Sequence, residues 1–145
     1  MSKSNALETA YLQLLFQNTN FANVGDATGL RGSTAAGQLF MSLHTADPDE
    51  AGTQSTSEVA YTGYARVGVA RSGAGFVVTG NAVALAADVT FPAGTGGSGT
   101  ATHWGIGTAS SGAGVLLYKG TISPSIVCGN GVTPVLTAGT VVTED

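Results

Sequence analysis

Charged residues are scarce in this sequence. Only 10% of its 145 residues are charged, and the formal net charge is −4, whereas a typical soluble domain has about 25% charged residues. A folded surface with so few charges favours association, so we expect the protein to act within an assembly. The basic residues are scattered, which predicts no patch that could follow a phosphate backbone and therefore no direct binding of nucleic acid. They are Lys3, Arg31, Arg66, Arg71 and Lys119.

Cysteine and long apolar runs are also nearly absent. The single cysteine, Cys128, has no partner for an internal disulfide and follows two apolar residues, which predicts a buried side chain. No run approaches the about 18 apolar residues of a membrane span, so no membrane association is expected. The N-terminus has neither the apolar core nor the cleavage site of a signal peptide, and we expect folding in a cytoplasm.

Glycine and apolar residues are abundant instead. The sequence has 22 glycines and is 43% hydrophobic. High glycine content is common in disordered segments, but such segments are poor in apolar residues and rich in charge. This composition therefore favours a folded, mainly β protein with many tight turns.

One helix is predicted, at residues 4–18. Ser4 or Asn5 is suited to cap its start, with Glu8 in the first turn. Helical spacing places four apolar residues on one stripe, which would pack on the β core or dock on a neighbouring subunit. The stripe consists of Leu7, Tyr11, Leu14 and Leu15. Residues 21–37 follow as a glycine-rich loop, where Asp26 and Arg31 could form an ion pair.

The clearest strand is predicted at residues 39–48. Leu39, Met41 and Leu43 alternate onto one face, which we expect to be buried, and His44 falls on the other face. Pro48 ends the strand because it has no N–H to donate. We expect the rest of the β domain to be organised around this strand.

Further strand signals alternate with turn signals to the end of the chain. Gly80–Asn81 predicts a tight turn, Trp104 and Ile106 are expected to point inward, and a hairpin is predicted at Lys119–Gly120. Another hairpin is predicted at residues 129–131. The expected strands are 59–71, with clear alternation from residue 64, and 76–79, 83–85, 88–91, 101–107, 115–118, 121–127, 132–136 and 140–143.

The predicted fold is mainly β, with one N-terminal α-helix. The spacing of the strands indicates an antiparallel β-sandwich, jelly-roll-like, or a small barrel. We expect residues 1–37 to form the helix and its connecting loop, and residues 38–145 to form the β domain, as a single structural unit.

No catalytic, cofactor-binding or metal-binding residues are predicted. His44 and His103 lack a third ligand that would complete a zinc site. Asp47, Asp49 and Glu50 could suggest calcium, but their spacing is not that of an EF-hand and favours a solvated acidic turn. The chain also lacks a nucleophile elbow and a phosphate-binding loop. We therefore do not expect an enzyme.

Several short motifs, taken in order, resemble a family of small bacteriophage virion proteins. They are Asn-Ala-Leu at 5–7, Phe-Gln-Asn-Thr at 16–19, Ser-Leu-His-Thr-Ala-Asp-Pro at 42–48, Glu58, Tyr-Thr-Gly-Tyr-Ala-Arg at 61–66, Thr-Phe-Pro at 90–92, Thr-His-Trp-Gly-Ile at 102–106, Leu-Tyr at 117–118 and Ala-Gly-Thr at 138–140. Members of this family are named tail-fibre proteins or capsid decoration (cement) proteins. The resemblance implies a virion structural protein made in the host bacterial cytoplasm.

Of the two locations, the chain favours capsid decoration. It has no heptads and no internal repeat from which a fibre shaft could be built. The expected partners are the major capsid protein, on the outer capsid surface, and further copies of the chain, as a homotrimer or homodimer. A tail or tail-fibre component is the alternative. A third hypothesis is a carbohydrate-binding module, in which Trp104 with Tyr61 or Tyr64 would stack on a sugar ring.

Two regions are the candidates for a partner interface. The first is the helix face of Leu7, Tyr11 and Leu14. The second is the acidic loop after the first strand, whose carboxylates could meet basic groups on a partner. These carboxylates belong to Asp47, Asp49, Glu50 and Glu58.

Overall fold

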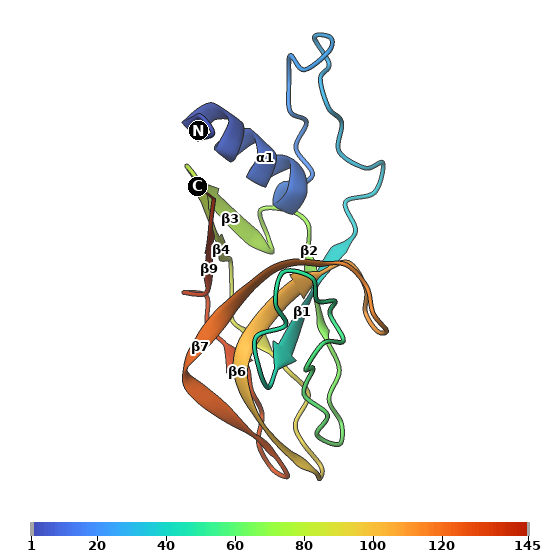
Figure 1. The fold of residues 1–145 in the computed structure, drawn as a ribbon. Helices are drawn as coiled ribbons and strands as arrows, with labels where there is room; N and C mark the ends of the chain where they lie inside the picture. Colours follow the sequence, from blue (N-terminus) through green and yellow to red (C-terminus); the bar gives the residue numbers. More distant parts are fainter. Residues whose placement is uncertain (1, 145) are drawn as a thin grey trace. The chain divides into compact units, whose positions relative to one another are not determined.

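The computed structural model describes residues 2–144 (Figure 1). The chain alternates between two compact units. Unit 1 comprises Met1–Gln38, Val69–Asp88 and Thr137–Asp145, and unit 2 comprises Leu39–Gly68 and Val89–Leu136. Unit 1 thus includes two segments from later in the chain.

Unit 1 is a helix packed on a small antiparallel sheet. Helix α1 (Asn5–Gln17) lies against β3 (Phe76–Thr79) and β4 (Ala82–Leu85), and β9 (Val141–Thr143) completes the sheet in the order β3-β4-β9. The predicted turn at Gly80–Asn81 joins β3 to β4 and is confirmed.

The helix was placed correctly by the sequence, but its buried face was not. Ser4 caps α1, with its Oγ accepting a hydrogen bond from the Leu7 N–H at 3.3 Å. The buried residues are Glu8, Leu12 and Phe16, a row with a spacing of four residues. The Phe16 ring meets Phe76 of β3 edge-on, with centroids 4.9 Å apart. Each residue turns a helix by about 100°, so the neighbouring stripe that begins at Leu7 lies to one side of the buried row, with Leu7 and Tyr11 exposed and Leu14 and Leu15 half-buried.

Unit 2 is built on the predicted central strand. The sheet order is β2-β1-β6-β7, where β1 (Gln38–His44) pairs antiparallel with β6 (Ser98–Gly107) and β6 pairs with β7 (Leu116–Gly129). The edge strand β2 (Val67–Ala70) continues into unit 1. A second small sheet pairs β5 (Val89–Thr90) with β8 (Val135–Leu136).

Much of the core of unit 2 comes from the paired strands β1 and β6. Met41 lies opposite Ile106 and Leu43 lies opposite Trp104, and all four side chains are buried. Leu39 is buried as well, so the predicted inward positions of β1 and of residues 104 and 106 are confirmed, but Ser42 and His44 on the other face of β1 are also fully buried. Cys128 is buried and free, as expected.

The two hairpins predicted in the C-terminal part are wrong. Residues 116–129 form one continuous strand, because Gly120 pairs directly with Trp104 and has no side chain to push the indole ring away. A Cβ at Gly120 would lie 2.5 Å from that ring. The turn at Gly129–Gly131 exists, but the strand after it, β8, pairs with β5 instead of β7.

The fold class matches the prediction. The structure is mainly β with antiparallel sheets and one N-terminal helix, as in a β-sandwich of this kind. Within residues 2–144 no sheet closes into a barrel, so the small-barrel alternative is not adopted.

Candidate functional site

The exposed face of α1 borders a hollow in unit 1, which we call the helix-face hollow. Its volume is about 200 Å³, and Tyr11, Leu14 and Leu15 form its apolar wall. Arg31, Ser33 and Arg71 also line it. Of the predicted helix-face residues, Leu7 and Tyr11 are 40% and 43% exposed, while Leu14 is half-buried.

Arg71 connects the two segments that line the hollow, the end of α1 and the loop after it. Its guanidinium donates to the Leu14 and Leu15 carbonyl oxygens at 2.8 and 2.7 Å, and these are carbonyls of the last helical turn. It also donates to Ser33 Oγ at 2.8 Å and to the Ala36 carbonyl oxygen at 3.0 Å. The last carbonyls of a helix lack partners within the helix and carry partial negative charge, so a cation stabilises this end. Arg71 thereby fixes α1 to the loop that follows it.

Arg31 lies in that loop and is exposed. The predicted ion pair with Asp26 does not form, because the Asp26 carboxylate accepts hydrogen bonds from Thr28 and from the Gly29 N–H. These bonds, the one from the Thr28 side chain first, lower the pKa of Asp26. Among residues 2–144, Arg31 makes no hydrogen bond or ion pair, so its donors are directed to solvent.

The acidic loop lies in unit 2 and presents two free carboxylates. Asp47 pairs with Lys119 at 2.7 Å, and this hydrogen bond lowers the pKa of Asp47 and raises that of Lys119. Asp47 Oδ1 also accepts from the Asp49 N–H at 2.9 Å, and Pro48 between them is buried. Asp49 and Glu50 are exposed and form no ion pair within the described residues. The turn is therefore held by Asp47 and Pro48 and presents the next two carboxylates outward.

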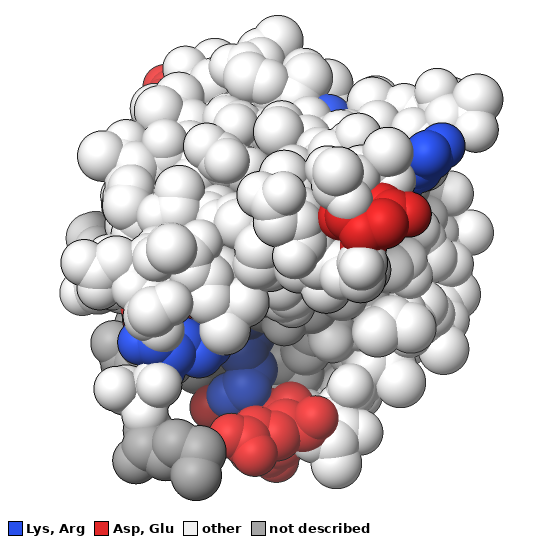
Figure 2. Space-filling view, turned by 90° about the horizontal axis from the view of Figure 1, so that it is seen from above, with Lys and Arg blue, Asp and Glu red and all other residues white. Residues whose placement is uncertain are grey.

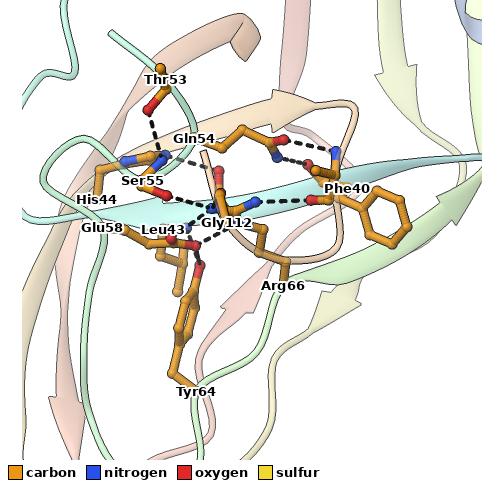
Figure 3. A network of polar contacts seen from close by, with 12 residues as sticks. Phe40, Leu43, His44, Thr53, Gln54, Ser55, Glu58, Tyr64, Arg66 and Gly112 are labelled. Atoms are coloured by element: carbon orange, nitrogen blue, oxygen red, sulfur yellow. Dashed lines mark hydrogen bonds and ion pairs between the residues drawn. The ribbon is translucent and has the colours of Figure 1, made fainter. Parts of the chain in front are cut away.

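Glu58, the fourth predicted carboxylate, has a different environment. It forms a two-pronged ion pair with Arg66, with Nε–Oε1 at 2.7 Å and Nη2–Oε2 at 2.8 Å, and it accepts from the Tyr64 hydroxyl at 2.8 Å (Figure 3). The Arg66 side chain is only 2% exposed and also donates to the carbonyl oxygens of Ala109 and Gly112. The Glu58–Arg66 pair thus fastens loop 109–112 to the body of unit 2. The structure groups Asp47, Asp49 and Glu50 on one turn and places the Glu58 carboxylate in an internal network.

The same network buries His44, which the strand pattern had placed on an outward face. Its Nδ1 contacts the Thr56 carbonyl oxygen at 2.8 Å, and its Nε2 lies 2.9 Å from Ser42 Oγ. A carbonyl oxygen only accepts, so Nδ1 carries the proton and Nε2 accepts from the serine hydroxyl. Burial is the main cause of a lowered pKa for His44, which favours the neutral ring. His44 is a structural residue that ties the 53–58 loop to β1.

Comparison with known protein families shows to which family the chain belongs. A family model, Gp80, described as Podophage GP4 fiber I protein gp80, matches residues 2–144. The chain belongs to the Gp80 family. No curated protein matches it significantly. The family match confirms the resemblance to small bacteriophage virion proteins, some of which are named for tail fibres, and it identifies the chain as a phage virion structural protein.

The Gp80 match covers both candidate regions. The sequence had indicated only some of the residues that line the helix-face hollow. Leu15 was placed on the stripe and does line the hollow, whereas Arg31 and Arg71 were not predicted as site residues. These two arginines are 40 positions apart, and no local motif joins them. The only signal was that basic residues are rare. The face in Figure 2 is accordingly mostly uncharged, with basic and acidic side chains in a few small groups.

The aromatic residues of the carbohydrate hypothesis are not arranged as a binding platform in this Gp80-family chain. Trp104 is 6% exposed and Tyr61 is 2% exposed. The Tyr61 hydroxyl donates to the Pro92 carbonyl oxygen, and the Tyr64 hydroxyl donates to Glu58. Burial also raises the pKa of both tyrosines. Trp104 and Tyr61 are therefore core residues and Tyr64 is half-buried with its hydroxyl bonded to Glu58, so the structure gives this hypothesis no support.

The described residues contain no group of three or more potential metal ligands, and no helix among them is long and apolar enough to cross a membrane. Every fully buried polar side-chain nitrogen and oxygen atom in residues 2–144 has a hydrogen-bond partner. The candidate sites in this part of the chain are therefore surface features, namely the helix-face hollow and the acidic turn.

Proposed function

We propose that the protein is a non-catalytic structural subunit of the tail-fibre apparatus of a phage virion, where it acts through protein–protein contacts. The observation that carries this proposal is the match of residues 2–144 to the Gp80 family, whose description names a phage fibre protein. The family description concerns the fibre protein after which the family is named, and its transfer to this chain is our proposal.

The form of the chain favours a short connecting piece over a fibre shaft. Shafts gain length from extended coiled coils or stacked repeats. The one helix in residues 2–144 spans 13 residues, and the strands form small antiparallel sheets. A subunit of this kind suits a joint at which a fibre attaches to the particle. Its expected surfaces are the exposed face of α1 and the acidic turn.

Capsid decoration is the second candidate. The observation that favours it is the same lack of a shaft, together with a low surface charge that suits burial against another protein. In that function the protein would bind the major capsid protein on the outer capsid surface, with a standard interface of about 1,600 Å² for each copy.

Copy number and position in the virion test both candidates. Quantitative mass spectrometry of purified particles, with the portal protein as an internal standard, would give the number of copies. A handful or a few dozen copies, located by cryo-electron microscopy at the tail, supports the fibre proposal. Hundreds of copies on the head would replace it with the decoration function, and absence from the particle would refute both.

Matched variants test the proposed surfaces. Tyr11→Glu places a charge on the exposed helix face, and Glu50→Lys reverses a free carboxylate of the acidic turn. Ala87→Glu and Ala87→Lys change the charge at an exposed alanine in the loop before β5 and serve as controls. Loss of incorporation with Tyr11→Glu or Glu50→Lys, with both controls incorporated normally, supports contact through these surfaces.

A further inference from the structure

The basic residues of the described chain divide into two groups. Three of them pair with carboxylates: Lys3 with Glu144, Arg66 with Glu58 and Lys119 with Asp47. The other two, Arg31 and Arg71, have no carboxylate partner among residues 2–144, and both line the helix-face hollow. The hollow is therefore the place in unit 1 where positive charge is left without a counter-charge.

The two arginines contribute in different ways. The donors of Arg71 are engaged by carbonyl oxygens and by Ser33, so this residue supplies a fixed positive field. Arg31 is exposed, and its guanidinium is free to bind a carboxylate in the forked geometry that arginine favours. Tyr11 and Leu14 add apolar surface beside these charges. An occupant should therefore combine carboxylates with a short aliphatic portion.

The size of the hollow also restricts the occupant. Sites for small molecules usually measure about 300–1,000 Å³, whereas this hollow measures about 200 Å³ and is open to solvent. That volume suits one or two side chains on a protruding turn of another protein. The acidic turn of this chain has the matching chemistry, because Asp49, Glu50 and Ala51 are exposed in succession and the two carboxylates have no ion-pair partner in the described residues.

We propose that the Asp49–Glu50 turn of one copy docks in the helix-face hollow of a second copy, where its carboxylates bind Arg31 in the field of Arg71. The turn is pre-ordered by Asp47 and the buried Pro48, so little conformational entropy is lost on docking. The contact joins two different surfaces. It can therefore generate a closed ring or an open chain, or can be made twice in a two-fold dimer. This inference deepens the proposed function, on which it rests, because a structural virion subunit acts in several copies.

Charge reversal tests this contact in solution. Sedimentation velocity and light scattering would compare the wild-type protein with Arg31→Glu and Glu50→Arg, with circular dichroism as the check of folding. We expect the wild type to self-associate at low salt and more weakly at high salt, because exposed charges are screened. Each reversal places like charges together and should weaken association about tenfold or more. Ala87→Glu and Ala87→Arg should leave it unchanged.

The decisive measurement is complementation. In an equimolar mixture of Arg31→Glu and Glu50→Arg, each hollow faces a turn of opposite charge, so association should return. The double variant should also self-associate. A wild type that stays monomeric at millimolar concentration, or a mixture of folded variants that stays monomeric, would overturn the proposal.

Particle incorporation separates this proposal from the proposed function. If Arg31→Glu self-associates like the wild type but is lost from virions, the hollow receives a different virion protein and the second-copy proposal is wrong. If the contact is confirmed in solution but the protein is absent from virions, the proposed function fails and the self-contact stands.

Discussion

Removal of the Glu58 carboxylate is expected to destabilise unit 2 strongly. The Arg66 side chain is 2% exposed and the Glu58 side chain is 18% exposed, so the pair lies largely out of water. Glu58→Ala would leave the guanidinium with neutral acceptors alone and would deprive the Tyr64 hydroxyl of its acceptor. Breaking a buried pair by removing one partner costs about 3–5 kcal/mol. At about 2–4 °C per kcal/mol, the melting temperature should fall by roughly 6–20 °C.

The chain offers a direct assay and a matched control. The only tryptophan, Trp104, is buried in unit 2, so its fluorescence during urea unfolding reports on this unit. Glu50→Ala removes an exposed carboxylate and should change the free energy of unfolding by no more than about 0.5 kcal/mol. Replacing both members, as in Glu58→Leu with Arg66→Met, should recover part of the loss because no buried charge is left unpaired.

The outcome that would refute this reasoning is a Glu58→Ala protein as stable as Glu50→Ala. It would mean that Arg66 is hydrated in solution, and that the network does not fasten loop 109–112. A double variant less stable than Glu58→Ala would show that the bonds from Arg66 to the loop carbonyls matter more than the ion pair.

Three further predictions concern other parts of the structure. The lowered pKa of buried His44 means that the unfolded chain, with a histidine pKa near 6.5, binds the proton more readily. Stability should therefore fall as the pH drops below 6.5, by up to about 1.4 kcal/mol per pH unit, and urea titrations of His44→Gln should show a flatter slope in that window. Gly120→Ala places a Cβ against the indole ring and should cost about 1–3 kcal/mol, whereas Gly99→Ala, with open space around it, should be nearly neutral; fluorescence-detected unfolding compares the two. Leu12→Ala should cost about 2–5 kcal/mol because Leu12 is fully buried on α1, while exposed Leu7→Ala should cost far less, as measured by thermal unfolding followed by circular dichroism; equal losses would contradict the assignment of the Leu12 row as the buried face.

The helix illustrates how far local signals reach. Its limits, its capping by Ser4 and the turn at Gly80–Asn81 depend on residues close in sequence, and each was predicted. The buried face was missed because two neighbouring rows of α1 both carry apolar residues. Only packing on β3, where Phe16 meets Phe76, selects the row that is buried.

The C-terminal strands show where those signals fail. Glycine at position 120 indicated a turn, but opposite Trp104 it permits a continuous strand, and that partner lies 16 positions earlier in the chain. In the same way, nothing near Glu58 shows that its carboxylate will be held by Arg66 and Tyr64. Glu58 was grouped with the exposed acids because its charge is visible in the sequence and its burial is not.

Composition, short-range periodicity and the order of motifs along the chain were enough to predict the mainly β class with one N-terminal helix, the buried apolar positions of β1 and the resemblance to small phage virion proteins. The folded structure was needed to show which carboxylates are internal, which face of α1 is exposed and that Arg31 and Arg71 line the same hollow. Burial and charge pairing depend on contacts between residues that are tens of positions apart, and such contacts leave no local pattern.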